Sequence, residues 1–109
     1  MIAYLSGELL EKGPDYVVLL AGDVGYRVQT TAPHGPLWVH AITGETGTRL
    51  YGFQTQPERD RFVELLGVDG VGPKTAMAIG MTPLTSAALC AVRGVGKKTA
   101  EKIVEALCA

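Results

Sequence analysis

The first half of the chain alternates short apolar runs with glycine-containing turns, a pattern that predicts β-strands. The first run is interrupted by Ser6-Gly7, and a glycine within a strand often marks a bulge or a sharp bend. The last two runs are joined by a segment with two glycines, which allows a tight hairpin. We therefore expect five short strands, over residues 2–10, 16–20, 26–30, 37–43 and 48–53.

The spacing of apolar residues changes to a helical period at Thr55. Thr55, the proline that follows and Glu58 together form a helix-start signal, because the hydroxyl and the carboxylate can satisfy backbone amides of the first turn. This helix is expected to end at Gly67 and to bury Phe62, Leu65 and Leu66.

Two further helix signals follow. A start is expected at Thr82-Pro83, and a last helix should bury Ala100, Ile103, Val104 and Leu107 on one face. The sequence therefore predicts an α+β protein with two domains. Residues 1–55 form a five-stranded, OB-like β-barrel, and residues 56–109 form an all-α domain.

Composition supports a folded chain. Its 109 residues are 47% hydrophobic and 19% charged, and no apolar run is long enough to span a membrane. We expect a cytoplasmic protein with reduced cysteines and no metal site. Residues 1–55 carry three basic and five acidic side chains, whereas residues 56–109 carry seven basic and six acidic ones. This asymmetry indicates that the second half meets an anion.

The most informative feature is an internal repeat. Residues 68–79 can be laid over residues 92–103 at an offset of 24, and eight of the twelve positions are identical. Each copy contains Gly-Val-Gly followed by a Lys-Thr pair, with apolar residues at helical spacing on both sides. Each copy is therefore expected to form two helices joined by a glycine hairpin.

Such a hairpin suits phosphate. Glycines allow close approach of the backbone, and the unpaired amides at the start of the following helix favour an anion. The predicted DNA-binding residues are Gly70, Val71, Gly72, Lys74 and Thr75 in the first copy and Arg93, Gly94, Val95, Gly96, Lys97, Lys98 and Thr99 in the second. Plain structural turns are the alternative, and the two valine side chains are better suited to filling the core.

Catalysis is not expected. A phosphate-binding loop would need glycine at position 91 and a hydroxyl residue at position 98, where the chain has Ala91 and Lys98. We find no acidic cluster suited to a two-metal nuclease and no nucleophile beside a plausible base. No cofactor is implied.

The paired Gly-Val-Gly motifs resemble tandem helix-hairpin-helix units. Together with Gly25-Tyr26-Arg27-Val28 and Leu50-Tyr51-Gly52-Phe53, they resemble the RuvA family, the Holliday-junction-binding subunit of the bacterial branch-migration complex. The resemblance implies a homotetramer that binds four-way junctions through phosphate contacts and holds them open during recombination and DNA repair.

The sequence departs from this family in three places. The family has a third domain that recruits the hexameric RuvB-like ATPase, whereas this chain ends at Ala109, so recruitment is not expected here. The segment 30–38 is shorter than its counterpart. The family also has two adjacent acidic residues that form a pin at the junction centre, where this chain has Glu45 followed by Thr46.

Other interpretations stay open at this stage. The helical half could be a protein–protein interaction module, or the barrel could bind single-stranded DNA through its aromatic residues, although core packing explains those residues more simply. Arg27 and Arg49 either steer DNA towards the junction centre or are merely solvated.

Overall fold

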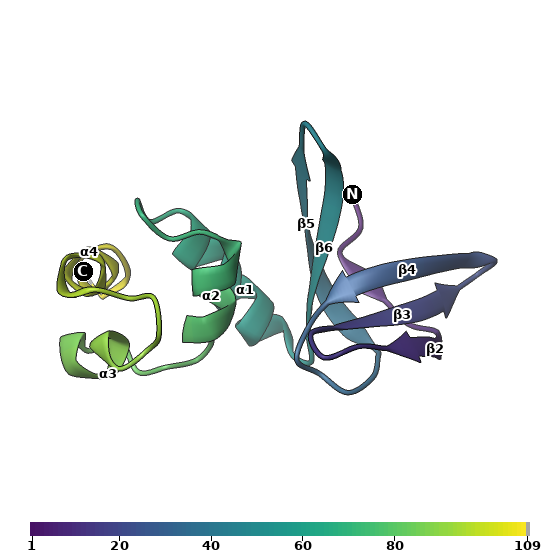
Figure 1. The fold of residues 1–109 in the computed structure, drawn as a ribbon, viewed down its shortest axis with the longest axis horizontal. Helices are drawn as coiled ribbons and strands as arrows, with labels where there is room; N and C mark the ends of the chain where they lie inside the picture. The colour runs from purple at the N-terminus through teal and green to yellow at the C-terminus, as the bar shows by residue number, and fades with distance from the viewer. Residues whose placement is uncertain (109) are drawn as a thin grey trace. The chain divides into compact units, whose positions relative to one another are not determined.

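The computed structural model describes residues 1–108, which divide into two compact units, 1–59 and 60 onwards (Figure 1). The first unit is a six-stranded sheet. Its strands are β1 (Tyr4–Leu5), β2 (Glu8–Lys12), β3 (Tyr16–Ala21), β4 (Val24–Gln29), β5 (Leu37–Gly44) and β6 (Gly47–Phe53). The helices are α1 (Gln56–Leu66), α2 (Pro73–Ile79), α3 (Ser86–Cys90) and α4 (Lys97–Leu107). They lie in the second unit, except for the first four residues of α1, which belong to the first unit. The α+β class is confirmed.

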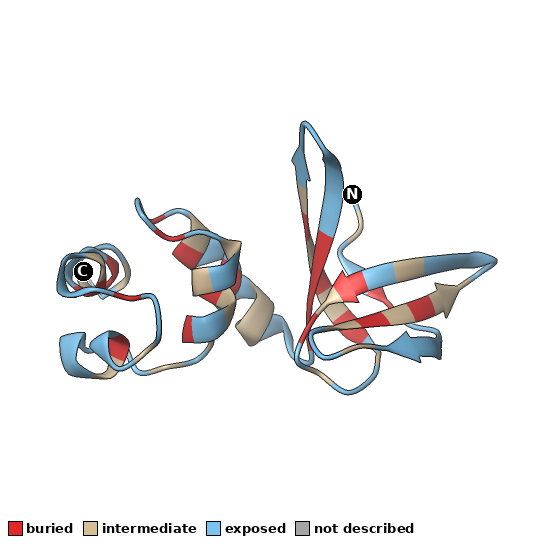
Figure 2. Ribbon diagram, viewed as in Figure 1, coloured by how far each residue is buried: buried red, intermediate tan, exposed pale blue. Residues whose placement is uncertain are grey.

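The strands are hydrogen-bonded in the order β1-β5-β6-β4-β3-β2. All pairs are antiparallel except β4 and β6, which run parallel with Val28 opposite Leu50. Alternate side chains of these strands point to one face and form the core of the unit, as the buried positions in Figure 2 show. The core members are Leu5, Val17, Leu19, Val28, Leu37, Val39, Ala41 and Leu50.

The prediction of five strands was wrong by one. The first apolar run is divided at Ser6-Gly7 into β1 and β2, which lie at opposite edges of the sheet. The chain can turn there because Gly7 lies against the backbone of β3, where a Cβ added to it would lie 1.9 Å from the carbonyl oxygen of Leu20. Since β1 and β2 do not pair with each other, the sheet is not closed, and the prediction of a barrel is correct only in the loose sense of a small, OB-like sheet.

Helix α1 begins as its sequence predicts. The amide of Glu58 donates to Thr55 Oγ1 at 3.3 Å, and the Thr55 hydroxyl donates to the Glu58 carboxylate at 2.8 Å, which forms a capping box. Phe62 and Leu65 are buried, but Leu66 is only half-buried and so departs from the prediction. Leu66 lies at the margin of the apolar stripe whose buried members are Phe62 and Leu65.

The helix start predicted at Thr82-Pro83 was also wrong. Thr82 bonds back to the Ile79 carbonyl oxygen and closes the end of α2, and α3 begins only at Ser86. Its cap is Thr85, whose hydroxyl accepts from the amide of Ala88 at 3.2 Å. In α4, Ala100 and Ile103 are buried as expected, whereas Val104 and Leu107 are half-buried. Among the described residues, no helix is long and apolar enough to cross a membrane.

Candidate nucleic-acid interface

The two copies of the repeat fold into hairpins of the same geometry. The first glycine of each has a positive φ, +89° at Gly70 and +90° at Gly94, a conformation that side chains strongly disfavour. The second glycine of each is the extended residue that precedes a helix, with φ −97° at Gly72 and −87° at Gly96. The repeated sequence therefore dictates a repeated backbone path.

Backbone hydrogen bonds also match between the hairpins. The amides of Val71 and Val95 donate to the carbonyls of Val68 and Val92, each at 3.1 Å. The side chains of Val71 and Val95 are only 7% and 6% exposed, so they pack in the core. Any contribution of these two valines to a ligand must therefore come from their main chain.

The two hairpins pack against each other reciprocally. A Cβ added at Gly70 would lie 3.7 Å from Thr99 Oγ1, and a Cβ added at Gly94 would lie 3.9 Å from Thr75 Oγ1. Each hairpin glycine therefore faces the first turn of the helix that follows the other hairpin. The two hairpins therefore lie side by side, and we call them the hairpin pair.

The predicted DNA-binding groups of the pair are largely accessible. Both glycines of each hairpin are exposed, as are Lys74, Arg93, Lys97 and Lys98, while Thr75 and Thr99 are half-buried. Neither Gly72 nor Gly96 supplies a side-chain cap to the helix that follows it. The first amides of α4 are thus left without a protein acceptor, beside two lysines that have no carboxylate partner within residues 1–108.

The hairpins differ in charge. Asp69 in the first copy is replaced by Arg93 in the second, and Pro73 is replaced by Lys97. Helix α2, which follows the first hairpin, has seven residues, whereas α4 has eleven. The second hairpin is therefore the more cationic and is followed by the longer helix dipole.

The predicted pin residue lies at the tip of a long hairpin. Glu45 and Thr46 are the two turn residues between β5 and β6, where Gly47 has a φ of +119°. The outer ends of both strands are exposed and project beyond the core of the sheet (Figures 1 and 2). Glu45 is therefore a single exposed carboxylate at the end of an arm.

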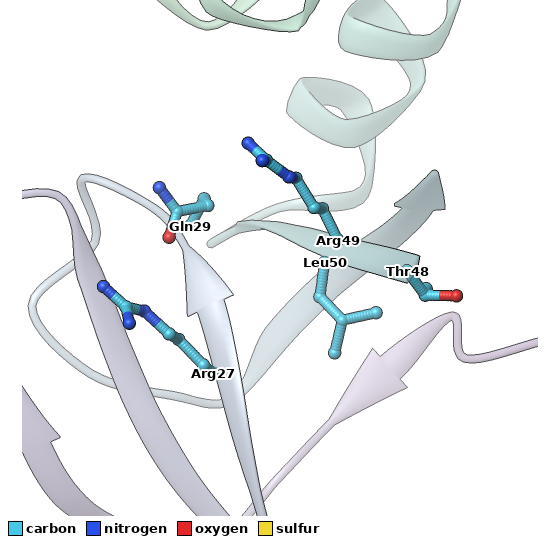
Figure 3. A pocket seen from close by; sticks show the side chains of 5 residues that line it. All are labelled: Arg27, Gln29, Thr48, Arg49 and Leu50. Atoms are coloured by element: carbon cyan, nitrogen blue, oxygen red, sulfur yellow. The ribbon is translucent and has the colours of Figure 1, made fainter. Parts of the chain in front are cut away.

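One feature of the sheet was not predicted from the sequence. A hollow of about 380 Å³ lies over β4 and β6, and Figure 3 shows its polar side chains. It is lined by Arg27, Gln29, Thr48, Arg49 and Leu50. The two arginines are 22 positions apart in the sequence, and only the parallel pairing of β4 with β6 brings them together.

Aromatic residues divide between the core and the surface. Tyr51, Phe53 and Phe62 are buried, in agreement with the core-packing interpretation. Tyr4, in contrast, is 47% exposed and lies edge-on to Trp38 with ring centroids 4.9 Å apart. Tyr16 donates its hydroxyl to the Glu11 carboxylate at 2.7 Å, and this hydrogen bond raises the pKa of Tyr16 above its ordinary value.

Comparison with known proteins places both units in described families. Residues 1–52 match the family model described as the RuvA N terminal domain, and residues 62–107 match the SAM-like helix-hairpin-helix tandem. Similar curated proteins are named "Holliday junction branch migration complex subunit RuvA". The one from Symbiobacterium thermophilum is 40% identical over 125 residues, and the one from Geobacter sp. strain M21 is 38% identical over 125 residues. These alignments cover 95% of this chain but 61% and 63% of the two relatives, so the chain spans about three fifths of their length.

Proposed function

Because this chain belongs to the RuvA family across both of its units, we propose that it binds four-way DNA junctions without reading their sequence. The DNA-binding residues are those of the two hairpins, and the contacts are made to phosphates rather than to bases. Its role is to bind and shape DNA in recombination and repair, with no catalytic site of its own. With DNA as its target, the protein acts in the cytoplasm.

The observation that carries this proposal is the pattern of identity between the hairpins. Some of the eight shared positions are explained by packing, because Val71, Ala76, Ile79 and their counterparts are buried. The glycine pairs and the Lys74 and Lys98 pair are exposed, and packing does not require a lysine. Repetition of an exposed lysine beside an uncapped glycine turn favours two copies of one anion site.

The second hairpin supplies the stronger of the two contacts in this proposal. The uncapped amides of α4 and the side chains of Lys97, Lys98 and Arg93 can surround one phosphate and its neighbour. The first hairpin contributes Lys74 and the backbone of Gly70 and Gly72. Paired hairpins can thus follow two stretches of a DNA backbone at a fixed separation.

Selectivity for a junction requires several such pairs on a symmetric scaffold. A tetramer would place eight hairpins, two per subunit, on the four arms of one junction. Because all of these hairpins would contact the same DNA at once, the affinity rises without new types of contact. Glu45 at the tip of the β5–β6 arm would then form a residual pin at the centre, repelling phosphates. The relatives are named as subunits of a branch migration complex, and in that setting another protein would supply the ATPase.

The test is a gel-shift titration of a synthetic four-way junction against linear duplex of the same length, at two salt concentrations. The mass of the complex is measured in parallel. We expect selective, salt-sensitive binding of the junction by four or eight chains. Lys98→Gln should weaken the binding, whereas Lys12→Gln, which removes one charge from exposed β2, should leave it unchanged.

Other outcomes would contradict the proposal in distinguishable ways. Salt-insensitive behaviour, or no binding to any DNA shape, would favour a protein–protein interaction module. Preference for unpaired DNA over the junction would favour a single-strand binder that uses the sheet.

A further inference from the structure

The hollow over β4 and β6 is built by strand alternation. Val28 and Leu50 lie opposite each other in the parallel pair and both belong to the core. Their preceding neighbours, Arg27 and Arg49, therefore lie on the opposite face of the sheet and beside one another. Figure 3 shows both side chains extended to the same side, with Gln29 between them in that view.

Arg27 is held in position by residues of the adjoining strands. Its guanidinium carbon lies 3.9 Å from the centroid of the Tyr16 ring, a cation–π distance. The Tyr16 hydroxyl is in turn anchored on the Glu11 carboxylate. Glu11 thus accepts a hydrogen bond from the tyrosine, and within residues 1–108 Arg27 forms no ion pair with it, so the guanidinium edge stays available to a ligand.

Arg49 is exposed, and none of the described residues forms an ion pair with it. Gln29 adds a neutral amide beside the arginines, whereas the Thr48 hydroxyl is hydrogen-bonded to that of Thr43 at 3.0 Å and points away from them (Figure 3). A concave site with two cations and an amide is chemically suited to an oxyanion, because the guanidinium fork matches phosphate oxygens. The volume of about 380 Å³ accommodates a phosphate with its flanking sugar.

We propose that this hollow binds one phosphate of a DNA backbone, held between Arg27 and Arg49 with Gln29 as a hydrogen-bonding partner. The inference rests on the proposed function and adds to it a DNA contact outside the hairpin pair. Its position on the β5–β6 arm gives it a specific role. Arg49 is four residues along the chain from Glu45 at the tip, which corresponds to roughly 10–14 Å along the strand. A phosphate held there would keep one DNA strand at a fixed distance from the Glu45 carboxylate, which repels phosphates.

The experiment compares junction binding by the whole chain and by the variants Arg27→Gln, Arg49→Gln and the double variant. Lys12→Gln is the matched control, since it removes one positive charge from the same sheet outside the hollow. Arg27→Lys, which keeps the charge, checks that changes at this position do not act through lost folding. We expect each glutamine variant to weaken junction binding by about tenfold at low salt. The double variant should lose less than the product of the two single losses, because both arginines hold the same phosphate.

Several results would overturn the inference. Arginine variants that bind the junction as Lys12→Gln does would exclude the hollow from the DNA interface while leaving the proposed function intact. Single losses that multiply in the double variant would assign the arginines to separate phosphates and contradict a shared site.

If the unaltered chain binds no junction, the proposed function is wrong, and anion binding by the hollow is tested in a separate experiment. Inorganic phosphate is then titrated into the isotope-labelled chain and followed by NMR. Shifts confined to residues 27–29 and 48–50, and absent in the double variant, would support an anion site that serves a free phosphate. No shifts at those residues would contradict the site itself.

Discussion

Gly7 shows how a single residue can determine the path of a chain. Its missing side chain lets the backbone lie against β3, and a Cβ there would meet the Leu20 carbonyl oxygen at 1.9 Å, inside any permitted contact. Backbone cannot yield as a flexible side chain can. The turn between β1 and β2 therefore depends on glycine at this position.

Gly7→Ala is expected to lower the free energy of unfolding by about 3 kcal/mol, because the strands must separate to admit the methyl group. Urea denaturation measures the change. Gly44→Ala is the matched control, since a Cβ there meets nothing within 4 Å, and its effect should stay within about 0.5 kcal/mol. Equal effects of the two substitutions would contradict this explanation of the turn.

Tyr16 gives a test of the contacts that support Arg27. The hydrogen bond to Glu11 raises the pKa of Tyr16, so the folded state binds the phenolic proton more tightly than the unfolded chain does. This contribution to stability is fully present below about pH 10 and is lost as pH rises through the raised pKa.

Glu11→Gln should shift the Tyr16 pKa back towards its ordinary value, as measured by tyrosinate absorbance during an alkaline titration. The Tyr16→Phe variant identifies which tyrosine is responsible, because its titration should lack that component. An unchanged titration in Glu11→Gln would show that the hydrogen bond does not control this hydroxyl.

At the residue scale, sequence reasoning succeeded where one pattern determines the outcome. The burial of the Val71 and Val95 side chains follows from apolar residues set between exposed glycines. Sequence reasoning failed where the position of a residue depends on its pairing with a strand that is distant in the sequence. Arg27 and Arg49 could not be joined into one hollow without the register of β4 and β6, which no local pattern encodes.

At the scale of elements, the helix after each hairpin begins with glycine where a better cap is available. Gly96 has an extended backbone, φ −87° and ψ 171°, that serine adopts without strain, and a Cβ there meets nothing within 4 Å. Serine would cap α4 and is a better N-cap than glycine by a few tenths of a kcal/mol. The uncapped glycine therefore has no structural justification in this chain.

Gly96→Ser should slightly stabilise the protein and weaken its binding to DNA, because the new side chain occupies both the amides and the space that a phosphate would approach. Thermal unfolding and the junction titration measure the two effects on the same sample. Stabilisation together with undiminished binding would remove the start of α4 from the interface.

Elements were predicted well where the signal was repeated or redundant. The capping box that begins α1 and the two hairpins were found because several residues point to each. The start of α3 was misplaced because Thr82-Pro83 and Thr85 both qualify as start signals. The choice between them depends on the bond from Thr82 back to the end of α2, a contact that competes with capping.

At the scale of the whole molecule, a formal net charge of −1 conceals an uneven distribution. The repeats differ at two charged positions, where Asp69 corresponds to Arg93 and Pro73 corresponds to Lys97. The second hairpin therefore has two more basic residues and one fewer acidic residue than the first. Long-range attraction to DNA should therefore concentrate on the second hairpin.

Lys98→Gln is expected to reduce the slope of log affinity against log salt by about one unit, and Lys74→Gln by less. Junction titrations over a series of salt concentrations measure both slopes. A larger change for Lys74→Gln would show that the charge difference between the hairpins does not govern binding.

The reciprocal contact between the hairpins has a consequence for how the helical unit can change. Gly70 faces Thr99 and Gly94 faces Thr75, which is the self-complementary relation of two subunits across an isologous two-fold axis. The unit is thus organised as a homodimer fused into one polypeptide. A single repeat on its own would expose half of that interface and should self-associate. After such a fusion the facing positions must stay matched, whereas the outward positions are free to diverge, and Asp69 and Arg93 are such a pair. Fusion therefore allows one symmetric binding surface to acquire a strong and a weak half.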